Sequence, residues 1–527
     1  MSSTFRSQPA RALWSLMAVG AVAVTMGWLA GRVSAAGASD IRVVNAVKAG
    51  DRSTLQKLIA QRADVNAAEP DGTTALHWAV RADDLDTTRL LVRGGANVKA
   101  ANRYGVTPIS LAAVNGNAAA IELLLKAGAD PNTTMEEGET VLMTAARTGK
   151  ADAVKALLVH GATANASESF EGETALMWAA AENHVDVTNL LVEVGADIDA
   201  RSKALDTPKL SFPRSGGPNT PFPRGGWTAA MYAARQGAAE TTRVLAERGA
   251  NLNVQDPDGT TALMLAIINA HYDTAAVLIE MGADPNVVDV SGMPALYAAV
   301  DIHTVRWTFG RPAPFLTEKL TAVDIVRMLL EHGAQPNAML RRALLARHHD
   351  PGDRQLSTGS TALMRAVKTG DADVVKLLLD HGADGTIIQP NGTTVLMIAA
   401  GLGTAPADTV VEVEAPRVSK VTEEGVVKVL ELCATRCGDV NAFNADGDTA
   451  LHGAVNRSAR VVKFILEHGA RADMKNKRGL APLDLALGNG GRGRGGPRPE
   501  GADKVRQASA DLIRQYLPPT TTPVSQP

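Results

Sequence analysis

The sequence predicts an all-α solenoid of about twelve stacked helix-turn-helix repeats, with short β-hairpin turns and loop insertions. A unit of about 33 residues recurs along most of the chain, and its most regular copy spans residues 257–289. The chain has 527 residues, more than one core usually holds. Hydrophobic residues make up 45% of it but aromatic residues only 4%, which suits thin, closely stacked helices.

The regular copy shows how each unit should fold. Asp258 and Gly259 mark a turn, Thr261 can cap a first helix, and Asp273 can cap a second one. Gly282 should end the second helix, because glycine tolerates positive φ. One unit is too short to bury its own apolar faces, so similar neighbours must stack on both sides.

The copies follow one another from about residue 40 to residue 517. Residues 40–69 form a polar first copy suited to capping one end, and a helix near residues 505–516 should cap the other. Residues 518–527 should be a disordered tail. The remaining copies contain turn glycines at Gly72, Gly105, Gly138, Gly172, Gly226, Gly259, Gly292, Gly359, Gly392, Gly447 and Gly479.

Two short motifs recur in these copies. One is the run at residues 74–77, Thr-Ala-Leu-His, and the other is the closing Gly-Ala-Asp of residues 128–130. In this order and spacing they resemble the ankyrin repeat, which implies a scaffold that binds proteins through a concave face. Methionine replaces the family's usual histidine at Met143, Met177, Met231, Met264, Met364 and Met397. We expect packing rather than cross-turn hydrogen bonds to hold those turns.

The first 35 residues have the layout of a secretory signal peptide. Arg6 and Arg11 precede an apolar run over residues 13–30, and small residues follow at 33–35. An uncleaved membrane anchor is the alternative, since the run is near the lower limit for a span. Either way the body should lie outside the cytoplasm, periplasmic or extracellular. Together with the repeats, this resembles an exported bacterial ankyrin-repeat protein.

The net charge, the cysteines and the motifs limit the kinds of partner and activity that we expect of this chain. The net charge of −3 gives no argument for a nucleic-acid partner. Cys433 and Cys437 could form one local bridge in an oxidising compartment or remain thiols, and two thiols alone do not make a zinc site. No phosphate-binding loop or nucleophile motif is present. We therefore expect no cofactor and no enzyme activity.

Five segments interrupt the regular spacing, and insertions of this kind map to loops on a solenoid. The first two contain Phe212, Phe222, Trp307 and Phe309, while the first and third are rich in basic residues. Aromatic and arginine side chains are frequent anchors of binding surfaces. The aromatic residues could also fold back as lids on exposed repeat ends. The segments are residues 201–224, 302–320, 339–357, 404–421 and 489–503.

Several residues of the repeats are candidates for partner contact. The resemblance implies that Trp227, at the variable turn position after Gly226, projects from its hairpin toward the binding groove. We expect Arg235 and Gln236 to be exposed at the end of the following helix. Arg147 and Asn269 should face the same groove. Trp78 and Trp178 should belong to the core. Other groove-facing positions are Arg81, Asn115, Glu139, Glu173, Glu182 and Ile268.

The predicted function is non-catalytic protein binding outside the cytoplasm, through the concave face and the aromatic and basic insertions. The partner is an unidentified protein, and membrane contact is limited to the N-terminal segment if it stays uncleaved. Two alternatives remain open. One is an accessory or metal-assisted enzyme built from the insertions, for which His348, His349 and Asp350 are the candidate ligands. The other is a structural spacer in the envelope.

Overall fold

The computed structural model describes residues 40–204, 211–212, 220–221, 225–304, 318–342, 356, 358–402, 422–455, 457–489 and 502–517. The predicted leader and tail lie outside these residues, as does most of each insertion. Within the described ranges, no helix combines the length and apolar character needed to cross a bilayer.

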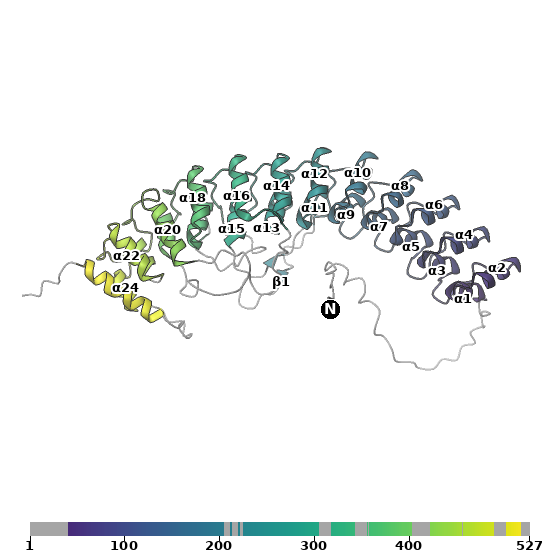
Figure 1. Cartoon of the computed structure of the whole chain (residues 1–527), viewed down its shortest axis with the longest axis horizontal. Helices are drawn as coiled ribbons and strands as arrows, with labels where there is room; N and C mark the ends of the chain where they lie inside the picture. The colour runs from purple at the N-terminus through teal and green to yellow at the C-terminus, as the bar shows by residue number, and fades with distance from the viewer. Residues whose placement is uncertain are drawn as a thin grey trace, which may run out of the picture.

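The described residues form a curved array of helix pairs, drawn as an arc in Figure 1. The prediction of an all-α repeat solenoid with about twelve repeats is confirmed. The helices are α1 (Arg42–Lys48), α2 (Arg52–Ala60), α3 (Ala75–Arg81), α4 (Leu85–Arg93), α5 (Pro108–Asn115), α6 (Ala118–Lys126), α7 (Val141–Thr148), α8 (Ala151–Val159), α9 (Ala175–Ala181), α10 (Val185–Glu193), α11 (Ala229–Gln236), α12 (Ala239–Glu247), α13 (Ala262–Ile268), α14 (Tyr272–Glu280), α15 (Ala295–Thr304), α16 (Ala322–Glu331), α17 (Ala362–Thr369), α18 (Ala372–Asp380), α19 (Val395–Ala400), α20 (Glu423–Cys433), α21 (Ala450–Ala454), α22 (Ala459–Glu467), α23 (Pro482–Ala486) and α24 (Ala502–Tyr516).

Two layers of helices make the arc. Odd-numbered helices pack against odd-numbered neighbours and even-numbered helices against even-numbered ones, and each pair also packs internally. From α1 to α15 the odd-numbered helices lie on the concave side and the even-numbered helices on the convex side (Figure 1). We call one helix pair with its preceding turn a copy, and the turn itself a finger.

A two-stranded antiparallel sheet extends one finger. Strands β1 (Ser211–Phe212) and β2 (Thr220–Pro221) pair between copies five and six, inside the first insertion. β1 lies on the concave side of the arc (Figure 1). The insertion therefore lengthens a finger there, and the helix α11 that follows it begins in the usual way at Thr228.

The helix ends follow local sequence chemistry. Thr261 begins α13, where its hydroxyl accepts a hydrogen bond from Met264 N at 3.3 Å, as predicted. Gly282 ends the second helix of that copy with a φ of 87°. The prediction for Asp273 is wrong: α14 starts at Tyr272 after His271, so Asp273 already lies inside the helix.

One small residue recurs where the inner helices touch. In the ten copies between the first and the last, the residue five positions after the cap of the first helix is an alanine with no exposed surface. Because alanine is small, neighbouring inner helices can approach closely, which explains how a chain with few aromatic residues forms a continuous core. These alanines are Ala79, Ala112, Ala145, Ala179, Ala233, Ala266, Ala299, Ala366, Ala399 and Ala454.

A ladder of asparagine side chains joins consecutive copies. Each donates from Nδ2 to the carbonyl of the closing glycine in the next copy, at 3.0–3.2 Å. Lys99, Asp199, Thr386 and Asp473 occupy the equivalent position in four other copies, where this amide is missing. The ladder asparagines of this type are Asn66, Asn132, Asn165, Asn286, Asn337 and Asn441.

The histidine and methionine copies differ as the sequence suggests. His77 Nδ1 accepts from Thr74 N at 3.2 Å, and its Nε2 lies 3.0 Å from the carbonyl oxygen of Val106 in the next copy. Met143 is also buried, but its sulfur only accepts from Thr140 N within its own copy, at 3.4 Å. A thioether has no N–H to donate across the turn, so packing holds the methionine copies.

Candidate functional site: the concave face

Trp78 lies between two cations on the concave side of the array. Lys48 Nζ is 4.5 Å from the indole centroid and the Arg81 guanidinium is 5.4 Å from it. The indole N–H donates to Glu69 Oε2 at 2.6 Å, and Lys48 donates to the other carboxylate oxygen at 2.8 Å. The hydrogen bond from Lys48 lowers the pKa of Glu69. Trp78 is only half-buried, so the expectation that it belongs to the core is wrong. Its ring and its N–H instead hold charged groups in place.

A second stack bridges two copies. Arg147 of α7 lies over the ring of Trp178 in α9, 4.9 Å from its centroid. The guanidinium is also 4.0 Å from Glu139, whose carboxylate accepts from the Thr144 hydroxyl at 2.7 Å. About half of the Arg147 side chain, 52%, stays exposed. Stacking and the nearby carboxylate therefore restrict this cation, while half of its side chain remains open to solvent.

The expectation that Trp227 projects outward is wrong. Only 4% of the residue is exposed. Its indole N–H donates to Asp256 in the next finger at 3.2 Å, and its ring meets Tyr232 edge-on at 5.4 Å. Burying an indole with its N–H satisfied is favourable, which explains why it turns inward. Arg235 covers the ring at 5.1 Å and is half-buried, whereas Gln236 remains exposed.

The other predicted contact residues occupy mixed environments. Asn269 is exposed, but its amide donates to Leu265 of its own helix at 2.8 Å. Glu173 and Ile268, predicted to line the groove, are buried at 7% and 4% exposure. Phe212 contributes its backbone to β1, and its side chain lies outside the described residues. Outside them too are Phe222, Trp307, Phe309, His348, His349 and Asp350.

Two side-chain pairs join α15, where the second insertion begins, to the following copy. Asp301 pairs with Arg365 of α17, and the two side chains are 4% and 12% exposed. His303 Nε2 lies 2.8 Å from Asp371, whose carboxylate caps α18 by accepting from Val374 N at 3.1 Å. One end of the insertion is therefore fixed to the following copy.

The other end of this insertion is fixed to the preceding copy. Glu318 accepts from Asp273 N at 2.8 Å, which gives α14 the cap that Asp273 itself does not provide. Asp273 in return accepts from Lys319 N and Leu320 N at 3.1 and 3.0 Å. Burial and the Glu318 charge raise the pKa of neighbouring Tyr272 to about 12. Sequence alone gives no sign of this reciprocal cap, because its two halves are 45 residues apart.

Among the residues that the structure describes, the cysteines and potential metal ligands do not form a second site. Cys433 and Cys437 are both buried free thiols, and the hydrogen bond from Cys437, together with burial, raises the pKa of Cys433. Bridging of these two residues remains a prediction. Across the described stretches, no three His, Cys, Asp or Glu side chains gather as a metal site.

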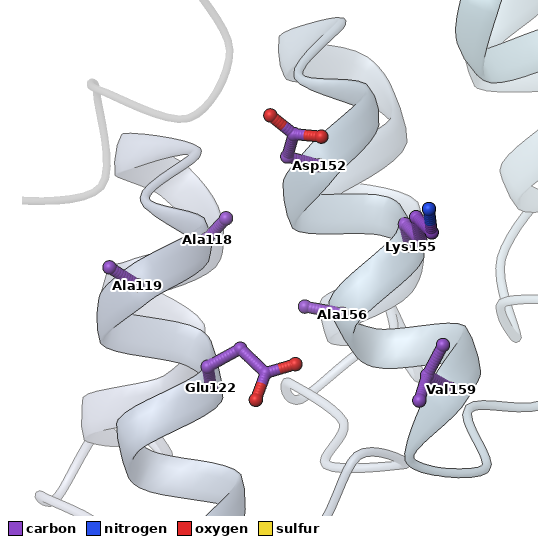
Figure 2. A pocket seen from close by; sticks show the side chains of 7 residues that line it. All are labelled: Ala118, Ala119, Glu122, Asp152, Lys155, Ala156 and Val159. Carbon is purple, nitrogen blue, oxygen red and sulfur yellow. The ribbon is translucent and has the colours of Figure 1, made fainter.

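A shallow depression of about 390 Å³ lies on the convex side, between α6 and α8. Figure 2 shows Glu122 of α6 reaching toward α8, with Ala118 and Ala156 on either side of the depression. Glu122 is engaged by Lys126 at 2.8 Å. The depression lies on the opposite layer from the tryptophan stacks, so the two do not form one site.

Helix pairs that stack on one another, each preceded by a finger, define a solenoid repeat protein. The family model described as ankyrin repeats (3 copies) matches residues 43–135, 128–202, 210–289 and 339–410, and a single ankyrin repeat matches residues 446–477. The chain belongs to the ankyrin repeat family. Membership places it among protein-interaction scaffolds, a class of modules that is generally not enzymatic.

Three relatives share part of this chain. Mitochondrial disaggregase of Bos taurus is 33% identical over 145 residues, which are 25% of this chain and 21% of the relative. B-cell lymphoma 3 protein homolog of Mus musculus is 29% identical over 211 residues, 34% of this chain and 42% of the relative. A putative ankyrin repeat-containing protein of Treponema pallidum (strain Nichols) is 27% identical over 201 residues, 35% of this chain and 63% of the relative. The chain thus spans less than two thirds of each.

Proposed function

We propose that the protein is a non-catalytic scaffold that binds another protein through its concave face, outside the cytoplasm. The observation that carries the proposal is the exposed Arg147 guanidinium, stacked on Trp178 of the next copy. Arg81 is exposed on the same side and lies over Trp78. Arginines of this kind, beside aromatic rings, are typical contact residues at protein interfaces.

Rigidity supports the same proposal. Each stacked arginine belongs to a short helix that packs on both neighbours, so much of its freedom is lost before any partner arrives. A surface ordered in advance loses less entropy on binding, which raises affinity without adding contacts. The aromatic and basic insertions, including Phe212, Phe222, Trp307 and Phe309, would extend this surface over copies six to nine.

Export is supported by the order of features in the first 35 residues, where Arg6 and Arg11 precede an apolar run and then small residues. The mature N-terminus tests this part. Protein purified from its own cells should begin near Ala36, and a start at Met1 would argue against cleavage.

Site-specific crosslinking in the native cells tests the binding face. A photo-crosslinking residue replaces Val114 or Gln236, which are exposed at the ends of the inner helices α5 and α11. Matched controls replace Val159 or Val194, which are 72% and 48% exposed on the outer layer. We expect the same protein to be captured from both inner positions and from neither outer one. Capture from the outer positions alone would refute a concave binding face.

A further inference from the structure

One position of the finger changes from small or polar residues to large apolar residues along the array. It lies two residues after the ladder position, and in the first six fingers it holds a small or polar residue: Ala68, Ala101, Thr134, Ser167, Arg201 and Gln255. In the next four fingers it holds Val288, Met339, Ile388 and Phe443, and then Lys475 follows. The change from polar to apolar is confined to consecutive copies, so these residues form a continuous row rather than scattered exceptions.

Three members of this row are open to solvent. Met339, Ile388 and Phe443 are 51%, 56% and 65% exposed, and we call them the apolar finger row. A contiguous row of large exposed apolar side chains is characteristic of an interaction site. The buried alanines and the asparagine ladder join the copies without these three side chains. Burial of the three side chains by a partner would therefore remove apolar surface from water without disturbing the stack.

The fingers that carry the row are fixed relative to each other. Asn337 donates to Gly382 O at 3.0 Å and accepts from Asp384 N at 2.7 Å, which joins the first finger to the second. Ala445 N donates to Asn391 O at 2.7 Å, which joins the second finger to the third. The three fingers therefore keep a fixed arrangement, and the spacing of fingers that precede packed helices is about 8–10 Å.

Charge distinguishes the two ends of the row from its middle. Arg341 and Arg342 follow Met339 and are exposed, and Lys475 and Lys477 lie beyond Phe443 and are exposed as well. In between, the Asp384 carboxylate is engaged by the Thr386 hydroxyl at 2.6 Å, which lowers the pKa of Asp384. A complementary partner has an apolar middle and an acidic residue near each end.

The spacing selects the partner's secondary structure. Residues seven apart on an α-helix lie about 10.5 Å apart on nearly the same face, whereas same-face residues of a β-strand repeat every ~6.7 Å. The finger spacing of about 8–10 Å fits the helix better. We infer that the apolar finger row binds an amphipathic helix of a partner protein, with apolar residues at i, i+7 and i+14 and acidic residues at both ends. The inference rests on the proposed function, because it names the partner chemistry of one part of the scaffold.

A synthetic peptide tests the inference with the full-length protein. The probe is a fluorescent helical peptide with leucines at i, i+7 and i+14 and glutamates at both ends, followed by anisotropy. A second peptide of equal composition carries the leucines at i, i+5 and i+10, which spreads them around the helix. We expect the first peptide to bind and the second to bind about tenfold more weakly or not at all. Equal binding of both peptides would overturn the helical register.

Protein variants locate the binding. The test variant combines Met339→Ser, Ile388→Ser and Phe443→Ser, and the matched control combines Tyr104→Ser and Phe170→Ser, two finger residues that are 62% and 68% exposed outside the row. Far-UV circular dichroism should match wild type for both, since all five side chains are exposed. We expect about tenfold weaker peptide binding for the triple variant only. Unchanged binding by the triple variant would refute the site.

Two further outcomes separate this inference from others. Vesicles containing anionic lipid serve as a second probe: if the triple variant loses vesicle binding and keeps peptide binding, the row is a membrane contact and the inference is wrong. The concave-face crosslinks at Val114 and Gln236 are read independently. Their absence would contradict the proposed function, whereas loss of peptide binding in the triple variant would still support a helix-binding row.

Discussion

Asn286 and Gly333 are 47 residues apart in the chain, yet Asn286 Nδ2 donates to the Gly333 carbonyl at 3.0 Å. The equivalent pair in a copy without an insertion, Asn66 and Gly95, is 29 residues apart and makes the same bond at 3.1 Å. The insertion therefore changes the length of chain between two copies and leaves their stacking unchanged. A continuous scaffold can for this reason carry extra loops without losing its shape.

Asn286→Ala should destabilise the junction between copies seven and eight. The side chain donates to Gly333 O and accepts from Gln335 N at 2.8 Å, so two hydrogen bonds are lost. We expect the free energy of unfolding to fall by about 1–2 kcal/mol in urea titrations, and the Gln335 amide to exchange faster with solvent. Lys99→Ala, at the same position of a copy without the asparagine, should change stability by less than about 0.5 kcal/mol. Equal losses would contradict the role of the ladder.

Glu318→Ala should weaken the start of α14. The carboxylate is the group that accepts from Asp273 N, and its side chain is only 14% exposed. Losing such a cap should lower the free energy of unfolding by about 1–2 kcal/mol, measured by urea denaturation. Glu331→Ala, which removes an exposed carboxylate at the end of α16, is the control and should have little effect. If both substitutions cost the same, the cross-copy cap is not a stabilising feature.

Gly149→Ala and Gly161→Ala form a matched pair. Both glycines have positive φ, 74° and 92°. A Cβ at position 149 would lie 2.5 Å from the ring of His184, whereas nothing lies within 4 Å at position 161. Each alanine should cost about 1–2 kcal/mol of stability for its backbone conformation. Thermal and urea unfolding should show an additional loss only for Gly149→Ala, because His184 must also give up its 2.9 Å hydrogen bond to Arg147 O. Identical losses would argue against that contact.

His77 should make the N-terminal copies sensitive to acid. Burial lowers the pKa of His77 below its ordinary value of 6.5, and its Nδ1 accepts from Thr74 N, so the folded state favours the neutral ring. The unfolded chain binds the proton more readily, and stability therefore rises with pH in this window and falls as pH drops through about 6.5. The change in unfolding free energy between about pH 7.5 and about pH 5 should be smaller in His77→Met, which copies the residue found in other repeats. An unchanged pH dependence would contradict this prediction.

The repeat pattern could be predicted because it depends on local chemistry. A threonine cap and a closing glycine each act within one copy, so Thr261 and Gly282 behave as expected. Pairings between copies could not be predicted in the same way. Asp273 looks like a cap in the sequence, but Glu318 supplies the cap from 45 residues away.

In the candidate site, too, features within one copy could be predicted from the sequence, whereas pairings between copies could not. The sequence places Trp227 in a finger but gives no sign that Asp256, in the next finger, accepts from its indole N–H. The sequence predicts that Arg147 faces the groove, whereas its stack on Trp178 depends on the geometry between copies. The exposed row containing Phe443 could have been found by comparing one finger position across all copies, since the apolar residues there are consecutive.

Charge reversal on the two layers of a single copy tests the central claim most directly. Arg147 on α7 and Lys155 on α8 are both exposed cations, one on the concave layer and one on the convex layer. With the partner captured by crosslinking, its dissociation constant is measured for wild type, Arg147→Glu and Lys155→Glu. A concave binding face predicts about tenfold weaker binding for Arg147→Glu and a change of less than about twofold for Lys155→Glu. Equal effects, or a loss with Lys155→Glu alone, would contradict it.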